Sequence, residues 1–181
     1  MKKAFKLLFL IAFAYLILQG SMILVKGVLF PLKYTNYVAK YSREYNVNPM
    51  LVMSVMKAES NFDESAESRK NAKGLMQITN TTGNWIAEQL GEENFEPNML
   101  LNPEISIKFA CWYLNNLNEQ FHDEGLVIAA YNAGRGNVEK WLSNHEYSSD
   151  GKNIDNIPFK ETDKYVKKVE AYKNIYTALY K

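Results

Sequence analysis

The chain has 181 residues, enough for one domain with a hydrophobic core and one additional segment, and its single cysteine, Cys111, excludes an intrachain disulfide. Residues 1–33 carry five lysines and no acid, so the formal net charge of +1 for the chain becomes −4 for residues 34–181, which hold 16 basic and 20 acidic residues. A mildly acidic domain has no bulk positive field, which argues against nucleic acid as a partner and favours a ligand recognised by shape and hydrogen bonds.

The N-terminal segment has the pattern of a membrane anchor. Lys2, Lys3 and Lys6 precede an apolar run that begins at residue 7 and continues, past 19–21, to Val25. This run is about long enough to cross a bilayer core of ~30 Å at ~1.5 Å per residue. No small-x-small cleavage site and no lipoprotein cysteine follow it. We therefore predict an uncleaved signal anchor and connector over residues 1–33, with a cleaved, secreted form as the alternative. The preceding lysines favour a cytoplasmic N-terminus, which places residues 34–181 outside the cell membrane.

Helical periodicity and capping signals predict an all-α domain after the anchor. A short connector is expected over 27–33, and helices over 34–45, from Pro49 to near Ser60, and from Thr81 to a stop at Gly91. Residues 61–78 are polar and lack sustained periodicity, which predicts an ordered loop. Asn102-Pro103 repeats the cap-then-proline signal of Asn48-Pro49 and predicts the longest helix of this domain.

The rest of the chain continues the helical pattern. Gly125 is expected to separate the helix that begins at Pro103 from residues 126–131, and Gly134 and Gly136 to separate these from 138–142. Residues 143–160 predict a surface loop with a turn at Asp150-Gly151, followed by a final helix from Thr162. No segment alternates over a strand length, so no sheet is expected.

Glu59 occupies a position where the predicted helix should present an apolar residue. Val52, Val55 and Met56 form one helical stripe, and its next members fall at Glu59 and its neighbours. A carboxyl buried without a partner tends to keep its proton, which is the state that general acid catalysis of acetal cleavage requires. A half-exposed carboxylate at a fraying helix end is the structural alternative.

Three further clusters contain residues suited to a binding site. Residues 68–78 combine Gly74, which permits close backbone approach, with the donor and acceptor side chain of Gln77. Residues 129–138 surround Tyr131 with small residues, and residues 161–169 place Tyr165 near a helix start. Taken singly, residues 129–138 also fit a helix–helix turn with a core tyrosine, and residues 161–169 also fit an ordinary capped amphipathic helix.

Together these segments resemble the soluble lytic murein transglycosylase (SLT) family, lysozyme-like enzymes that cleave bacterial peptidoglycan. The matching motifs, in order, are E-S-x-F at 59–62, S-x-x-x-A-x-G-L-M-Q at 68–77, A-Y-N-A-G-x-G-x-V at 130–138 and E-T-x-x-Y-V at 161–166. Asn80 departs from the usual proline after Met-Gln, and Asn71 from a common glycine. The resemblance implies a lysozyme-like helical domain over residues 34–181.

The resemblance also implies roles for individual residues. Glu59 matches the single catalytic acid/base, and Tyr131 and Tyr165 match tyrosines close to the reacting sugar. Asn132 belongs to the Tyr131 motif, and Glu161 matches a position with a structural role. Residues that match the lining of the glycan cleft are Ser60, Ser68, Met76 and Gln77.

The implied reaction is non-hydrolytic cleavage of the β-1,4 bond between N-acetylmuramic acid and N-acetylglucosamine, which leaves 1,6-anhydro ends. Asp63, Glu64 and Glu67 lie in a polar stretch and read as solvated loop charges, so the second carboxylate of ordinary glycosidases is not expected. A hydrolytic lysozyme that uses Asp63 or Glu64, and an inactive wall-binding module, are the alternatives. The expected partners are glycan strands and, through the N-terminal helix, the membrane. We expect a monomer with no cofactor and no metal site, since the two histidines, His122 and His145, read as surface residues.

Overall fold

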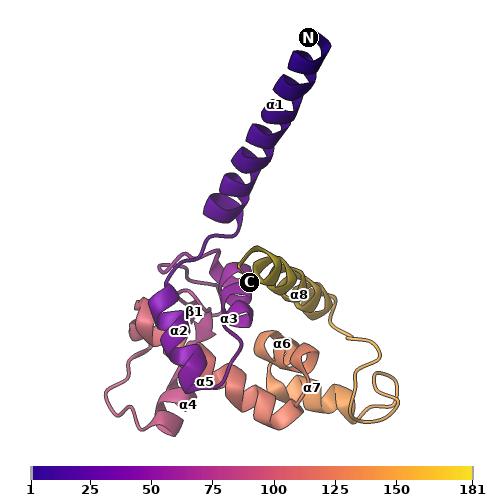
Figure 1. Ribbon diagram of the computed structural model, residues 1–181. Helices are drawn as coiled ribbons and strands as arrows, with labels where there is room; N and C mark the ends of the chain where they lie inside the picture. Colours follow the sequence, from indigo (N-terminus) through magenta and orange to yellow (C-terminus); the bar gives the residue numbers. More distant parts are fainter. Residues whose placement is uncertain (1, 181) are drawn as a thin grey trace. The chain divides into compact units, whose positions relative to one another are not determined.

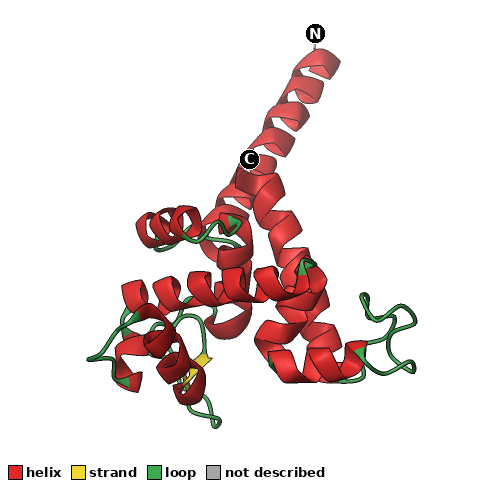
Figure 2. Ribbon diagram, turned by 90° about the horizontal axis from the view of Figure 1, so that it is seen from below, coloured by secondary structure: helices red, strands yellow, loops and turns green. Residues whose placement is uncertain are grey.

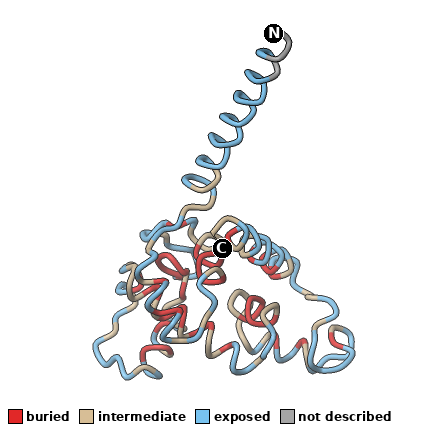
Figure 3. The backbone as a smooth tube through the Cα atoms, in the orientation of Figure 1, coloured by how far each residue is buried: buried red, intermediate tan, exposed pale blue. Residues whose placement is uncertain are grey.

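The computed structural model describes residues 2–180 and divides the chain into two compact units, one up to Lys33 and one from Tyr34 onward. The first unit is the helix α1 (Lys2–Leu24), which continues into the π-helical η1 (Val25–Leu29). Its apolar side chains from Leu8 to Leu18 are exposed, as Figure 3 shows along α1. The stretch Leu8–Leu29 has a mean hydropathy of 2.3 and, by length and composition, could cross a membrane.

The prediction that the connector begins at Gly27 was wrong. Gly27 and Val28 remain helical, and the Phe30 N–H donates to the Val25 carbonyl at 2.7 Å. One glycine costs a helix only about 1 kcal/mol, so a continued hydrogen-bond ladder can carry the helix past it.

The second unit is almost entirely helical, as Figure 2 shows by colour. In chain order its helices are α2 (Thr35–Glu44), α3 (Pro49–Ser60), α4 (Asn80–Leu90), the 3-10 helix η2 (Pro97–Leu101), α5 (Pro103–Phe121), α6 (Glu124–Ala133), α7 (Arg135–Leu142) and α8 (Lys160–Tyr180). Between α7 and α8 lies the expected loop, with Gly151 at φ +70° in its turn.

The predicted cap-then-proline starts are confirmed. The Asn48 side chain accepts a hydrogen bond from the Met50 N–H at 2.9 Å, and Asn102 accepts from the Glu104 N–H at 2.9 Å. In both cases the asparagine satisfies an N–H of the first turn, and the proline at the first helical position needs no partner.

Three expected helix limits were wrong. Helix α4 is capped by Thr79 and begins at Asn80, ahead of Thr81. Helix α6 includes Gly125, because its cap is Asp123, whose carboxylate accepts from the Leu126 N–H at 2.9 Å. Helix α8 begins at Lys160 and, with 21 residues, exceeds the 19 of α5, so the helix from Pro103 is not the longest of this unit.

The predicted ordered loop ends in a minimal hairpin. Strand β1 (Ala72–Lys73) pairs antiparallel with β2 (Ile78–Thr79), with Ala72 opposite Thr79. Two residues per strand are too few to produce a readable alternation of polar and apolar side chains. The domain is therefore mostly helical with one short hairpin beside the site described below.

Helix α3 is the centre of the second unit. Val52, Val55 and Met56 are fully buried, and α3 packs on α8, α2 and α5, while α6 packs on α5 and α8 (Figure 1). This packing brings the end of α3, the 61–79 loop, α6 and the first half of α8 to one place.

Candidate active site

Glu59 lies in the last turn of α3. The helix ends at Ser60 because Asn61 and Phe62 adopt left-handed backbone angles, with φ of 50° and 68°. Phe62 is buried and holds this reversal against the core. The carboxyl of Glu59 is thus placed at the inner edge of a helix end and is partly buried.

The Glu59 carboxyl accepts a hydrogen bond from helix α8. The Tyr165 hydroxyl of α8 donates a hydrogen bond to Glu59 Oε1 at 2.6 Å. Burial raises the pKa of Glu59 to about 7, against the opposing effects of the Tyr165 hydrogen bond and the charge of Lys168. The Lys168 ammonium is fixed nearby, where it donates to the Ala58 carbonyl at 2.9 Å. A carboxyl with a pKa near 7 can both give and take a proton at neutral pH.

A second tyrosine lies close to the same carboxyl. The Tyr131 hydroxyl of α6 donates to the Met76 carbonyl at 2.8 Å, and burial together with the charge of Glu59 raises the pKa of this phenol well above 10. The pKa of Tyr165 rises for the same two reasons, burial first. Both phenols therefore stay protonated and can act as hydrogen-bond donors at neutral pH.

Hydrogen bonds of predicted site residues hold the loop from Ala66 to Thr79 beside Glu59. The Ser60 hydroxyl donates to the Leu75 carbonyl at 2.8 Å, and Gln77 Nε2 donates to the Ala66 and Gly74 carbonyls, both at 3.0 Å. Met76 is fully buried, and its N–H donates to the Ser106 hydroxyl. The amide donors of Gln77 are used within the loop, which leaves its carbonyl oxygen for a ligand.

Asn132 and Ser68 have different surroundings. Asn132 Oδ1 accepts from the Thr162 hydroxyl at 2.9 Å, which ties α6 to the first turn of α8. Ser68 is exposed and its hydroxyl accepts from the Lys70 and Ala72 N–H groups, so it caps the turn that precedes β1. The glycan-binding roles expected for Ser60, Ser68, Met76, Gln77 and Asn132 stay predictions.

A pocket of about 240 Å³ opens beside this cluster. Its lining includes Gln77, Tyr131 and Asn132, which were predicted, and Thr79, Thr82 and Tyr113, which were not. The Tyr113 and Tyr131 rings are 5.6 Å apart between centroids. Tyr113 was missed because it sits at a helical position of α5 that is equally compatible with a core residue.

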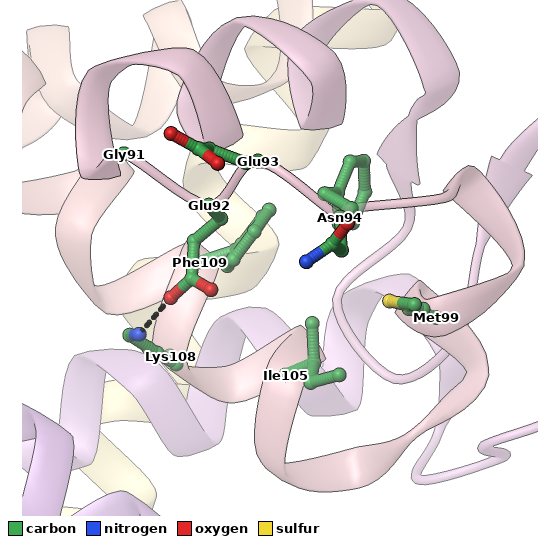
Figure 4. A pocket seen from close by; sticks show the side chains of 9 residues that line it. Gly91, Glu92, Glu93, Asn94, Met99, Ile105, Lys108 and Phe109 are labelled. Carbon is green, nitrogen blue, oxygen red and sulfur yellow. Dashed lines mark hydrogen bonds and ion pairs between the residues drawn. The ribbon is translucent and has the colours of Figure 1, made fainter.

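A larger pocket of about 480 Å³ lies between the α4–η2 connection and α5 (Figure 4). It is lined by Phe95, Met99, Ile105 and Phe109, and an ion pair between Glu92 and Lys108 stands at its edge. It shares no lining residue with the pocket beside Tyr131, and neither lining includes Glu59. We place the candidate site at Glu59 because the charge of this partly buried acid acts on Tyr131, which lines the smaller pocket.

Residues 36–154 match the family model of the transglycosylase SLT domain, and this match covers more than half of the chain. The chain belongs to the SLT transglycosylase domain family. The resemblance drawn from its four motifs is thereby confirmed.

Curated relatives of this SLT domain agree with that membership. The chain is 34% identical over 150 residues to the soluble lytic murein transglycosylase of Salmonella typhimurium, a match that covers 81% of this chain and 23% of that protein. It is 34% identical over 122 residues to the membrane-bound lytic murein transglycosylase C of Shigella sonnei, covering 62% of this chain and 34% of that protein. The SLT domain thus spans between about a quarter and a third of the length of these relatives.

Solved structures have the same fold. The 70 kDa soluble lytic transglycosylase of Escherichia coli matches with a TM-score of 0.73 at 30% identity, over 82% of this chain and 25% of that one. An inactive mutant of lytic transglycosylase Slt from Pseudomonas aeruginosa, in which one glutamate is replaced by glutamine, matches with a TM-score of 0.72 at 27% identity, over 82% of this chain and 24% of that one. The unit from Tyr34 onward therefore has the mostly helical, lysozyme-like fold of the SLT domain.

Proposed function

We propose that the chain is a peptidoglycan lytic transglycosylase, anchored in the cell membrane by the helix over residues 8–29, with Glu59 as its single acid/base. The observation that carries this proposal is the hydrogen bond between Tyr165 and a Glu59 carboxyl whose pKa is raised to about 7. Family membership and the names of the relatives support the substrate class.

In the proposed reaction, protonated Glu59 gives its proton to the glycosidic oxygen between N-acetylmuramic acid and N-acetylglucosamine as the C1–O bond breaks. The resulting carboxylate takes the proton from the muramoyl C6 hydroxyl, whose oxygen bonds to C1 and closes the 1,6-anhydro ring. No water is consumed, and Glu59 ends in its starting protonation state. An internal nucleophile needs positioning, and a second carboxylate is unnecessary.

The surroundings of the nearby acids favour this reaction over lysozyme-type hydrolysis. Asp63 is fully exposed and accepts hydrogen bonds from the Ser65 N–H and hydroxyl at 2.9 and 2.7 Å. Glu64 is also exposed and accepts from the Tyr34 hydroxyl at 3.0 Å. A two-carboxylate mechanism needs its second group across the scissile bond, and these contacts direct Asp63 and Glu64 to the surface.

The test is mass spectrometry of muropeptides released from purified peptidoglycan by the full chain in mild detergent. We expect products lighter by one water than hydrolytic products, and none from Glu59→Gln. Glutamine keeps the size of the side chain and removes the proton transfer. Asp63→Asn serves as the matched control and should release the same products as the wild type.

Other outcomes separate the alternatives. Hydrated reducing ends, lost in Asp63→Asn or Glu64→Gln, would identify a lysozyme. Binding to peptidoglycan without any released product from the wild type would identify a wall-binding module. Either result would refute the proposed reaction.

A further inference from the structure

Arg135 is a cation of the SLT domain for which residues 2–180 supply no acidic partner. It is the first residue of α7 and fills the unspecified position of the A-Y-N-A-G-x-G-x-V motif. Its guanidinium carbon lies 4.5 Å from the centroid of the Trp85 ring and 5.8 Å from that of Tyr113. Its Nη2 donates to Asn116 Oδ1 at 2.6 Å. Two aromatic rings and one amide thus fix the direction of the guanidinium.

The ion pairs found among residues 2–180 all use lysines, and none includes Arg135. This is unexpected in a unit that holds 20 acidic and 16 basic residues. The guanidinium is a fork of five N–H donors, and the bonds to Asn116 and Tyr113 leave other donors of the fork unused. Because Arg135 is partly exposed, the remaining donors can be reached from solvent.

Arg135 adjoins the pocket beside the candidate acid. Its neighbour Gly134 and its ring partner Tyr113 both line that pocket, together with Gln77 and Tyr131. Burial raises the pKa of Tyr113, and the charge of Arg135 and a hydrogen bond with it oppose that rise. The electrostatic influence of Arg135 therefore reaches the pocket wall.

We infer that Arg135 binds a carboxylate of the glycan ligand at the Tyr113–Gly134 end of this pocket. The inference rests on the proposed function, which supplies the ligand class. A planar guanidinium pairs with a carboxylate through two parallel hydrogen bonds, a geometry that the ammonium of lysine does not reproduce. The contact with Trp85 and the bond to Asn116 hold the guanidinium in advance, so less rotamer freedom is lost on binding.

Two carboxylates of peptidoglycan have the required chemistry. One is the lactyl carboxylate of N-acetylmuramic acid, which is free where the stem peptide has been removed. The other is a carboxylate of the stem peptide itself. Arg135 could bind either carboxylate through the same pair of hydrogen bonds. Binding measurements on glycans with and without stem peptides distinguish the two.

The decisive measurement is calorimetric binding to the full chain in detergent, in a Glu59→Gln background so that the ligand is not consumed. The ligands are muramic-acid-containing oligosaccharides with stems, the same oligosaccharides without stems, a carboxamide-blocked form of each, and a neutral N-acetylglucosamine oligomer. Arg135→Gln removes the charge, Arg135→Lys keeps the charge without the fork, and Lys140→Gln removes an exposed charge from the same helix as a matched control.

We expect Arg135→Gln to raise the Kd for at least one carboxylate ligand about tenfold, the effect of losing one charge-assisted hydrogen-bonded contact. The Arg135→Lys variant should lose less affinity, and Lys140→Gln none. The difference should shrink as salt is raised, because a partly exposed ion pair is screened. Unchanged affinity for the neutral oligomer shows that the variants are folded. If Arg135→Gln loses affinity for the oligosaccharide without stems, the carboxylate that Arg135 binds is the lactyl group. If affinity is lost only for the oligosaccharide with stems, that carboxylate belongs to the stem peptide.

An equal Kd for wild type and Arg135→Gln, or an equal loss with the carboxamide-blocked ligands, would overturn the inference. Its failure is distinct from failure of the proposed function, because the first is read from the Kd of Arg135 variants and the second from the absence of anhydro products with wild type.

Discussion

At the Glu59 carboxyl, burial and hydrogen bonding act in opposite directions. Burial disfavours the ionised form, while the Tyr165 hydroxyl and the Lys168 charge favour it. The result is a pKa of about 7, between that of a solvated glutamate and that of a carboxyl buried without any partner. Both protonation states are therefore accessible at neutral pH, which is the requirement for one group to serve as acid and then as base.

This balance predicts a pH-dependent cost in stability. Below pH 4.5 Glu59 is protonated in both folded and unfolded chains, so ionisation contributes nothing. Between pH 4.5 and about 7 the unfolded chain ionises while the folded chain keeps its proton, so the free energy of unfolding falls as pH rises. A rise of the Glu59 pKa from 4.5 to about 7 lowers the free energy of unfolding by about 3 kcal/mol above pH 7.

Glu59→Gln lacks this titration. Urea unfolding at pH 4.5 and pH 8 should show the variant gaining up to about 3 kcal/mol relative to wild type between the two pH values. A stability difference that does not change with pH would mean that the carboxyl has an ordinary pKa.

Tyr165→Phe separates the hydrogen bond from burial. Removing a donor to the carboxylate disfavours ionisation, so the loss of activity on the alkaline side should move to higher pH. The rate constant kcat should also fall about tenfold, because the carboxyl loses the contact that orients it. A pH–rate profile of anhydro-product release measures both effects. The control is Tyr37→Phe on α2, which should match wild type, and an unshifted alkaline limb would contradict the assigned contact.

At the scale of elements, the loop between α3 and α4 depends on one close approach. Gly74 has φ +70°, and a Cβ at this position would lie 2.0 Å from the Leu100 carbonyl oxygen of η2. Both the backbone angle and the space therefore require glycine. The Gly74 carbonyl also accepts from Gln77, so this contact joins η2 to the loop that lines the pocket.

Gly74→Ala should lower the free energy of unfolding by about 3 kcal/mol, the combined cost of a left-handed alanine and an overpacked contact. Gly91→Ala is the matched comparison. Gly91 has φ +69° but no atom near the added Cβ. Gly91→Ala should therefore lower the free energy of unfolding by about 1 kcal/mol, the cost of the left-handed backbone angle alone. Equal losses in urea unfolding would show that the Leu100 carbonyl yields to the added methyl group.

The helix starts and the contacts between helices show what sequence patterns can and cannot predict. The starts of α3 and α5 followed from Asn48 and Asn102, because a cap is a contact within three residues. Helix α6 began before Gly125 because Asp123 supplied a cap that outweighed the glycine. The contact between Tyr165 and Glu59 joins residues 106 positions apart, so no local pattern could specify it and only the family motifs pointed to both. The stacking of Arg135 on Trp85 had no such motif and was not foreseen.

At the scale of the whole molecule, an apolar helix and an acidic SLT domain are joined in one chain. If the helix is an uncleaved anchor, the full-length chain should stay with membranes after alkaline carbonate extraction and should have the mass of the intact sequence. Leu10→Arg with Leu16→Arg should release it, since each central arginine costs about 3 kcal/mol of insertion. A shorter, soluble product from the wild-type gene would instead identify a cleaved signal.

The position of Tyr165 on α8 also affects the order of events during biosynthesis. Chains are made from the N-terminus, so Glu59 leaves the ribosome about a hundred residues before the tyrosine that binds its carboxyl. Until α8 docks on α3, the acid has neither its hydrogen-bond donor nor the burial that this packing provides, so its pKa should lie closer to that of a solvated glutamate. A fragment that stops short of residue 160 lacks the Tyr165 donor, so the acid/base role that we propose for Glu59 should depend on the docking of α8.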